Sequence, residues 1–86
     1  MSEERLVEIG RITHYFANIN VAVVELSDSL AVGDTIAIKG STTDFEQVVK
    51  SMQIEHESVT KVDAGQSIGL KVQERVRTND SVYKKQ

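Results

Sequence analysis

The stretch Leu30–Gly40, with the sequence LAVGDTIAIKG, constrains the fold of this chain more than any other stretch. Its Gly33-Asp34 pair signals a turn, because glycine accepts positive φ and aspartate hydrogen-bonds to its own turn backbone. After the turn, Ile36 and Ile38 point to one side while the residues around them point to the other, which is strand alternation. The stretch therefore predicts a tight turn and a strand, with partner strands supplied by the flanking segments.

The composition indicates one small domain over residues 1–86 with an aliphatic core. Of the 86 residues, 40% are hydrophobic and only 5% are aromatic, so the core must consist of Val, Ile and Leu, and β-branched residues favour strands. The net charge of −3 argues against a surface that is entirely a nucleic-acid footprint. The chain contains no cysteine, which excludes disulfides and thiolate metal sites. It shows no signal peptide and no apolar run long enough for a membrane span, so we expect a cytoplasmic protein without membrane contact.

The rest of the chain divides into further short strands with polar turns between them. We expect strands at residues 6–16, 21–26, 32–39, 45–56, 67–72 and 81–83. A β-bulge at Gly10-Arg11 would keep Val7, Ile9 and Ile12 on one side of the first strand. Residues 1–5 and 85–86 are expected to be frayed. Six strands without a long helix indicate a closed barrel, because closure removes exposed strand edges.

Three segments carry additional expectations. The segment 21–26, VAVVEL, is apolar on both faces, so we expect a central strand that is covered on both sides over part of its length. The segment 45–56 fits a strand in which Lys50 reaches solvent or a bulge near Ser51 resets the register, but it also fits a helix capped by Asp44. Residues 61–64 predict one short helical turn that ends at Gly65.

Candidate functional residues fall into two groups of cations, one of them with an aromatic residue. Thr42, Thr43 and Phe45 follow a strand, where an aromatic ring could stack a base or anchor a partner, or simply plug the barrel end. A turn-forming Ser/Thr/Asp cluster and a solvated face are the plainer interpretations of this segment. The first group is Lys39, Thr42, Thr43, Phe45 and Lys50. The second is the C-terminal basic run of Lys71, Arg75, Arg77, Lys84 and Lys85, which Glu74 and Asp80 interrupt.

Little in the sequence indicates catalysis or a cofactor. His14 and His56 are the only imidazoles, and they lack ligand spacing and a visible nucleophile partner. We interpret them as solvent-facing strand histidines. The segment Lys39-Gly40-Ser41-Thr42 is not a phosphate loop, because the upstream glycine spacing is absent. We therefore expect no enzyme activity, no metal, no cofactor and no bound nucleotide.

Several motifs resemble a known group of β-barrels. These are Ile9–Phe16 (IGRITHYF), Val21–Leu26, Leu30–Gly40, Thr42–Gln47, Ser51–Ile54 and Ala64–Val72 (AGQSIGLKV). Together they cover nearly the whole chain and resemble small translation-elongation-factor-like proteins. They are also similar to the second, β-barrel domain of translational GTPases such as elongation factor Tu, and to the C-terminal barrel of collagenase-like peptidases. The resemblance implies a six-stranded closed barrel in which residues 45–56 form strand, and it transfers a frame but no catalytic site.

Two functions follow from the resemblance. The first is a non-catalytic binding module that engages RNA, such as tRNA or ribosome-related RNA, or an RNA-bound protein. Its candidate surface is Lys39, Thr42, Thr43, Phe45, Lys50, Lys71, Arg75 and Arg77. The second is a protein–protein adaptor that supplies in trans a barrel that relatives carry fused to an enzyme, which the acidic balance favours.

Overall fold

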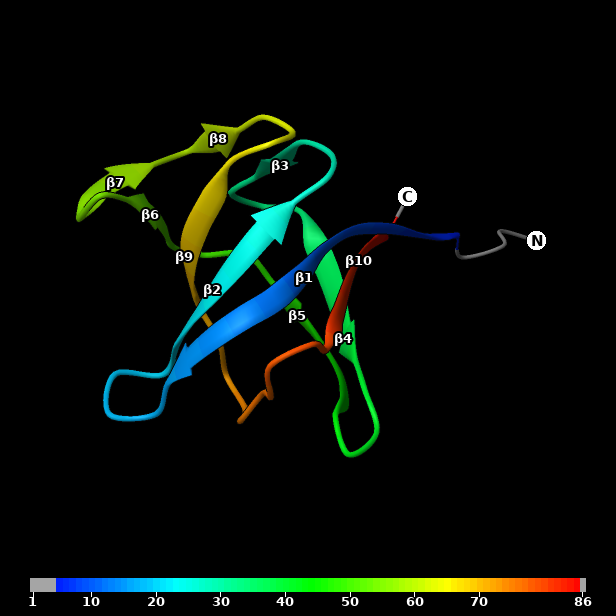
Figure 1. The fold of residues 1–86 in the computed structure, drawn as a ribbon. Helices are drawn as coiled ribbons and strands as arrows, with labels where there is room; N and C mark the ends of the chain where they lie inside the picture. Colours follow the sequence, from blue (N-terminus) through cyan, green and yellow to red (C-terminus); the bar gives the residue numbers. More distant parts are fainter. Residues whose placement is uncertain (1–4, 86) are drawn as a thin grey trace.

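A computed structural model describes residues 5–85 of the chain, and these residues form ten β-strands and no helix (Figure 1). The strands are β1 (Leu6–Phe16), β2 (Val21–Leu26), β3 (Leu30–Ala31), β4 (Thr35–Lys39), β5 (Asp44–Val48), β6 (Met52–Ile54), β7 (Glu57–Val59), β8 (Lys61–Val62), β9 (Ser67–Lys71) and β10 (Ser81–Lys85). The predicted all-β class is confirmed. The strand count is ten instead of six, because the predicted strand 45–56 is divided into β5 and β6, and because β3, β7 and β8 lie outside the predicted strands.

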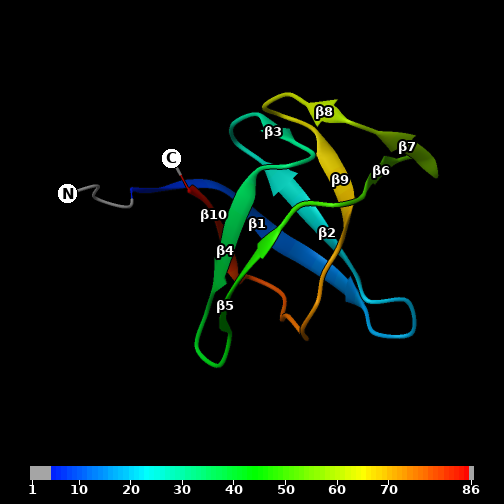
Figure 2. The same ribbon diagram turned by 180° about the vertical axis from the view of Figure 1, so that it is seen from behind.

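Eight of the strands form one antiparallel sheet in the order β5-β4-β10-β1-β2-β9-β6-β7, and β3 pairs separately with β8 (Figure 2). The C-terminal strand β10 lies between β1 and β4, so the two ends of the chain meet in the middle of the sheet. Among residues 5–85, no ladder joins the outer strands β5 and β7. The predicted closure into a barrel is therefore not confirmed.

A side chain spans the place where a backbone ladder is missing. Gln47 in β5 is buried, and its Nε2 donates to the carbonyl of Lys71 at 2.9 Å. Its Oε1 accepts from the backbone N–H of Gln73 at 2.8 Å. The segment after β5 then bends toward β9, where the N–H of Lys71 donates to the carbonyl of Ser51. The Gln47 amide thus replaces two backbone hydrogen bonds between β5 and the chain that leaves β9. We call this junction the Gln47 seam.

The segment 45–56 forms two strands, which excludes the helical alternative. Between β5 and β6 the chain bends, so that Val49 and Met52 both enter the core while Lys50 stays exposed. Lys50 reaches solvent, which is the first of the two explanations, and the inward positions change at a break between two strands instead of at a bulge within one. Val49 is fixed by hydrogen bonds with the Gly33-Asp34 turn, in which Gly33 has φ of 100°.

The predicted helical turn at residues 61–64 is wrong. Lys61 and Val62 belong to β8, where Val62 pairs with Leu30 and is buried in the core. Burial of Val62 against a strand partner outweighs the local preference for a helical turn. A tight turn follows at Ala64-Gly65, where Gly65 adopts the positive φ that its position suggested.

The first strand changes register twice, near the predicted bulge. The shifts fall between Glu8 and Gly10 against β10 and between Ile12 and His14 against β2. As a result Ile9 and Ile12 both lie fully inside, whereas Val7 is only half-buried. Gly10 permits the close approach of β1 to β2, because a Cβ at this position would lie 2.7 Å from the carbonyl oxygen of Glu25.

The core is aliphatic, as the composition predicts. Its buried members are Ile9, Ile12, Ala22, Val24, Leu26, Leu30, Ile36, Ile38, Val49, Met52, Val62, Ile68, Leu70, Val72, Val76 and Val82. Tyr15 and Phe45 pack against its margin. The ordered sheet extends to Lys85, which pairs with Leu6, although we expected fraying at residues 85–86. Residues 1–4 and 86, which we also expected to be frayed, lie outside the described part of the chain.

Candidate functional site

The first predicted group is built mainly into the turn between β4 and β5. Thr43 is buried, and its carbonyl accepts a hydrogen bond from the N–H of Gly40. Phe45 is half-buried and packs against the margin of the core. Lys39 pairs with Asp44 at 3.9 Å, and both side chains are largely exposed, so this ion pair contributes little to stability. Thr42 and Lys50 are exposed. Thr42 lies in the turn, whereas Lys50 follows the opposite end of β5.

The second predicted group lies beside the hairpin that joins β1 to β2. Arg75 and Arg77 lie in the loop between β9 and β10. Together with His14 and Tyr15 of β1 they line one surface pocket. The ammonium of Lys71 donates to the carbonyl of Ile19 at the hairpin tip, at 2.9 Å. The hairpin tip and the loop between β9 and β10 lie at the same end of the molecule in both ribbon views (Figures 1 and 2). The structure therefore brings three members of this group, Lys71, Arg75 and Arg77, to one end of the molecule.

Asp80, one of the carboxylates that interrupt this basic run in sequence, is withdrawn from the surface. It is buried, and its Oδ2 accepts from the backbone N–H of Arg77 at 2.8 Å. The carboxylate also occupies the space above Gly40, where a Cβ would lie only 1.9 Å from Asp80 Oδ1. Asp80 thus shapes the loop before β10 and joins it to the β4–β5 turn. Lys84 donates to the carbonyl of Ser29, and Lys85 pairs with Glu46, so both lie along β10 instead of on the basic surface.

Sequence reasoning missed an apolar patch on the outer face of the same region. Ala22, Val24 and Leu26 of β2 point into the core, so Val21 and Val23 point outward. In the ladder with β1, Val21 lies opposite Phe16 and Val23 lies opposite His14. The ring centroids of His14 and Phe16 are 4.4 Å apart. The segment VAVVEL is apolar on both faces, which was the one signal in the sequence for an outer apolar patch. It could not predict which residues of other strands would lie beside Val21 and Val23.

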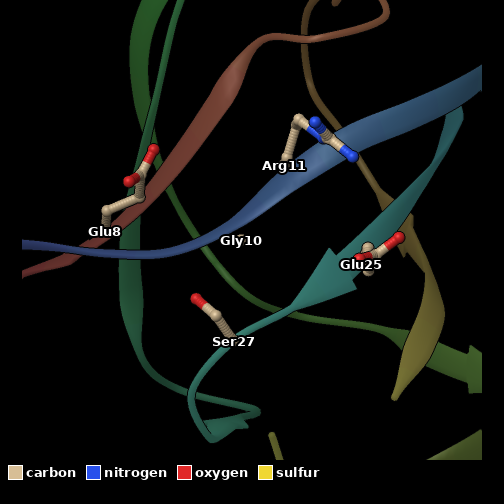
Figure 3. Close-up of a pocket in the computed structure, with 5 residues that line it drawn as sticks. All are labelled: Glu8, Gly10, Arg11, Glu25 and Ser27. Atoms are coloured by element: carbon tan, nitrogen blue, oxygen red, sulfur yellow. The ribbon is translucent and has the colours of Figure 1, made fainter. Parts of the chain in front are cut away.

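A different pocket, on the upper part of β1 and β2, is charged (Figure 3). Its lining residues are Glu8, Gly10, Arg11, Glu25 and Ser27. Arg11 lies opposite Glu25 in the ladder between the two strands. The charged side chains around Gly10 are exposed, which is typical of a solvated sheet face.

The two histidines lie on separate hairpins. His14 contacts Phe16 on β1, whereas His56 lies in the turn between β6 and β7 with φ of 68°. Within residues 5–85, no group of three or more His, Asp or Glu side chains is arranged to hold a metal ion. The same part of the chain contains no helix with the length and apolar character of a membrane span.

Comparison with known proteins places this chain beside a domain of larger proteins. The chain matches no family model. It is 45% identical to an uncharacterised protease of Methanocaldococcus jannaschii over 83 residues, which are 95% of this chain and 20% of that protein. Two Porphyromonas gingivalis proteins named collagenase are 36% and 37% identical over 80 and 78 residues. The chain thus spans about a fifth of the length of these relatives (20%, 19% and 22%).

The fold matches that of a separately crystallised domain. Two structures of the C-terminal domain of a candidate U32 peptidase from Geobacillus thermoleovorans superpose with TM-scores of 0.82 and 0.85, each at 18% identity. These matches cover 87% and 91% of this chain and 95% and 91% of the other. The collagenase-like part of the predicted resemblance is confirmed. The resemblance to translation elongation factors has no support in these comparisons, and at this identity the structural match shows the fold alone.

Proposed function

We propose that this chain is a non-catalytic adaptor module that provides an enzyme with a domain that related proteins carry within their own chain. One observation carries the proposal. The similarity to the Methanocaldococcus protease covers 95% of this chain and only 20% of that protein. The activity that the relative's name describes then belongs to the remaining part, and the shared segment serves it by binding.

The apolar outer face of β1 and β2 supports the same function. Phe16 and Ile19 are 45% and 56% exposed, which is unusual for large apolar side chains that lie close together on a small domain. Such residues commonly anchor protein interfaces. The adaptor acts in the cytoplasm and needs no cofactor of its own.

Affinity capture on the intact chain, with and without ribonuclease, tests this function. We expect a peptidase-like chain to be retained after ribonuclease treatment, because the contact is between proteins. Capture of material that disappears entirely with ribonuclease would contradict the adaptor function.

RNA binding is the second candidate function, and one observation favours it. Arg75, Arg77, His14 and Tyr15 line a common pocket, which combines cations for phosphate with rings for stacking. A titration with tRNA at about 50 mM salt tests it, because counterion release favours binding at low salt. Absence of a complex under these conditions would eliminate RNA as the ligand.

A further inference from the structure

The outer face of β1, β2 and β9 forms a small grid whose members are fixed by strand register. One row contains His14, Val23 and Gly69, and the adjacent row contains Phe16, Val21 and Lys71. Val21 and Val23 are half-buried, and Phe16 is 45% exposed. A strand that is apolar on both faces is normally covered on both. Here the outer apolar residues remain accessible.

A hollow lies beside these apolar residues, and Gly69, which has no side chain, forms part of its wall. Its lining residues are Ile19, Val21, Ser51, Gln53, Gly69 and Lys71. A Cβ at Gly69 would lie 3.3 Å from Val21 Cγ1 and would narrow the hollow. Ile19, the most exposed of the large apolar residues, forms part of its wall. The hollow can receive a small apolar side chain against Ile19, Val21 and Gly69, while Ser51, Gln53 and Lys71 supply its polar lining.

The rim of this face carries an excess of positive charge. Lys71 lies at the hollow itself, and Arg75 and Arg77 line a second pocket together with His14, which belongs to the same face. Glu74 is the exposed carboxylate in the same loop. The whole chain has a net charge of −3, whereas the net charge of this rim is positive. Such an arrangement orients an approaching acidic surface toward one face.

We propose that this outer face is the docking surface for an acidic protein partner that places an apolar side chain beside Gly69. The proposal deepens the proposed function and rests on it, since it specifies where the enzyme binds and which chemistry it presents. A protein fits the hollow better than RNA does, because its wall residues Ile19 and Val21 are aliphatic and cannot stack a base. The rings of His14 and Phe16 lie elsewhere on the same face. The basic rim supplies orientation, and the apolar centre supplies affinity.

A direct binding measurement tests the docking surface. The probe is the Methanocaldococcus protease from which the 83-residue segment similar to this chain has been deleted. Titration calorimetry with the intact chain should detect a complex. The double variant Phe16→Ala, Ile19→Ser should weaken it about tenfold or more, as expected for truncated anchors. The matched control Val32→Ser, Val48→Ser changes two other apolar residues that are 41% and 43% exposed, and it should change the affinity less than about twofold.

Charge reversal tests the rim separately. Arg75→Glu with Arg77→Glu should slow association and reduce its dependence on salt. The control Lys39→Glu, Lys61→Glu makes the same change in net charge at exposed positions on β4 and β8, and it should have little effect. Circular dichroism and thermal unfolding verify that each variant is folded.

The possible outcomes separate the two proposals. If the unmodified chain does not bind the truncated protease, both the adaptor function and the docking surface are wrong. If it binds equally well after both changes on the outer face, the docking surface is wrong while the adaptor function stands. Displacement of the protease by tRNA at this face would assign the surface to RNA and overturn the proposal.

Discussion

The two faces of β2 are both apolar, but only one of them is packed. Ala22, Val24 and Leu26 lie inside with 0–3% of their surface exposed, whereas Val21 and Val23 on the outer face are half-buried. The inner residues lie among strands that the chain itself supplies. The outer residues lie beside Phe16 and a hollow at Gly69. The difference indicates that the inner face of β2 stabilises the fold. The outer valines contribute less to stability than fully buried valines would.

The largest expected effect is on the inner face. Leu70→Ala removes a fully buried side chain from β9 and should lower the free energy of unfolding by about 2–5 kcal/mol. Urea unfolding followed by circular dichroism measures it. The control Val48→Ala, at a position that is 43% exposed, should cost much less. Equal losses for the two variants would contradict the distinction between packed and accessible apolar residues.

The next effect concerns the polar group that is buried with the core. Gln47→Leu removes the hydrogen bonds to the Lys71 carbonyl and the Gln73 N–H, and should cost about 1–3 kcal/mol because both backbone groups lose their partner. Gln53→Leu, at an exposed position, serves as the control in the same unfolding experiment. A Gln47→Leu variant as stable as the unmodified chain would show that the seam does not need the amide.

A third variant should stabilise the protein, because one exposed turn is strained. Glu55 and His56 form the two-residue turn between β6 and β7, with φ of 50° and 68°. Side chains other than Gly, Asn and Asp are unfavourable in this conformation. Glu55→Asn with His56→Gly should raise the free energy of unfolding by about 1–2 kcal/mol. Glu57→Asn, in the adjacent strand, controls for the loss of charge, and an unchanged or lower stability of the double variant would count against strain.

The smallest expected effect gives the most direct comparison of the two faces. Val23→Thr on the outer face should change the free energy of unfolding by less than about 0.5 kcal/mol. Val24→Thr, its neighbour on the inner face, should cost about 1–3 kcal/mol because the hydroxyl is buried. Chemical denaturation of the pair measures both. A cost at Val23 similar to that at Val24 would mean that the outer face already packs against something in the isolated chain.

The longer strands were predictable from the sequence because alternation and turn chemistry are local, whereas the short strands β3, β7 and β8 were not. The turn at Gly33-Asp34 and the strand with Ile36 and Ile38 follow from neighbouring residues alone. The missing ladder between β5 and the chain that leaves β9 was not predictable. It depends on the bend at residues 49–51 and on the Gln47 side chain, which hydrogen-bonds to the backbone of Lys71 and Gln73. The backbone of Glu55-His56 also carries no sequence signal, because neither residue is typical of such a turn.

The candidate surface was predictable only in part. Lys71, Arg75 and Arg77 were identified from charge, and the structure gathers them beside the β1–β2 hairpin. The apolar residues near these cations could not be predicted, because their positions depend on strand register. Phe16 of β1 lies opposite Val21, and Gly69 of β9 lies opposite Val23. Periodicity within one strand cannot predict which residues lie across from it. The other predicted group, around Thr43 and Phe45, lies largely in a turn and against the core margin.

The Gln47 seam has a consequence for the motions of the protein. The Gln73 amide is held by one side chain instead of by a run of paired backbone groups. A single rotamer change of Gln47 would therefore expose this amide to solvent while the strands on either side stay paired. Deuterium should enter at Gln73 far earlier than at the central amides of β2, through a small local opening that leaves the rest of the sheet intact.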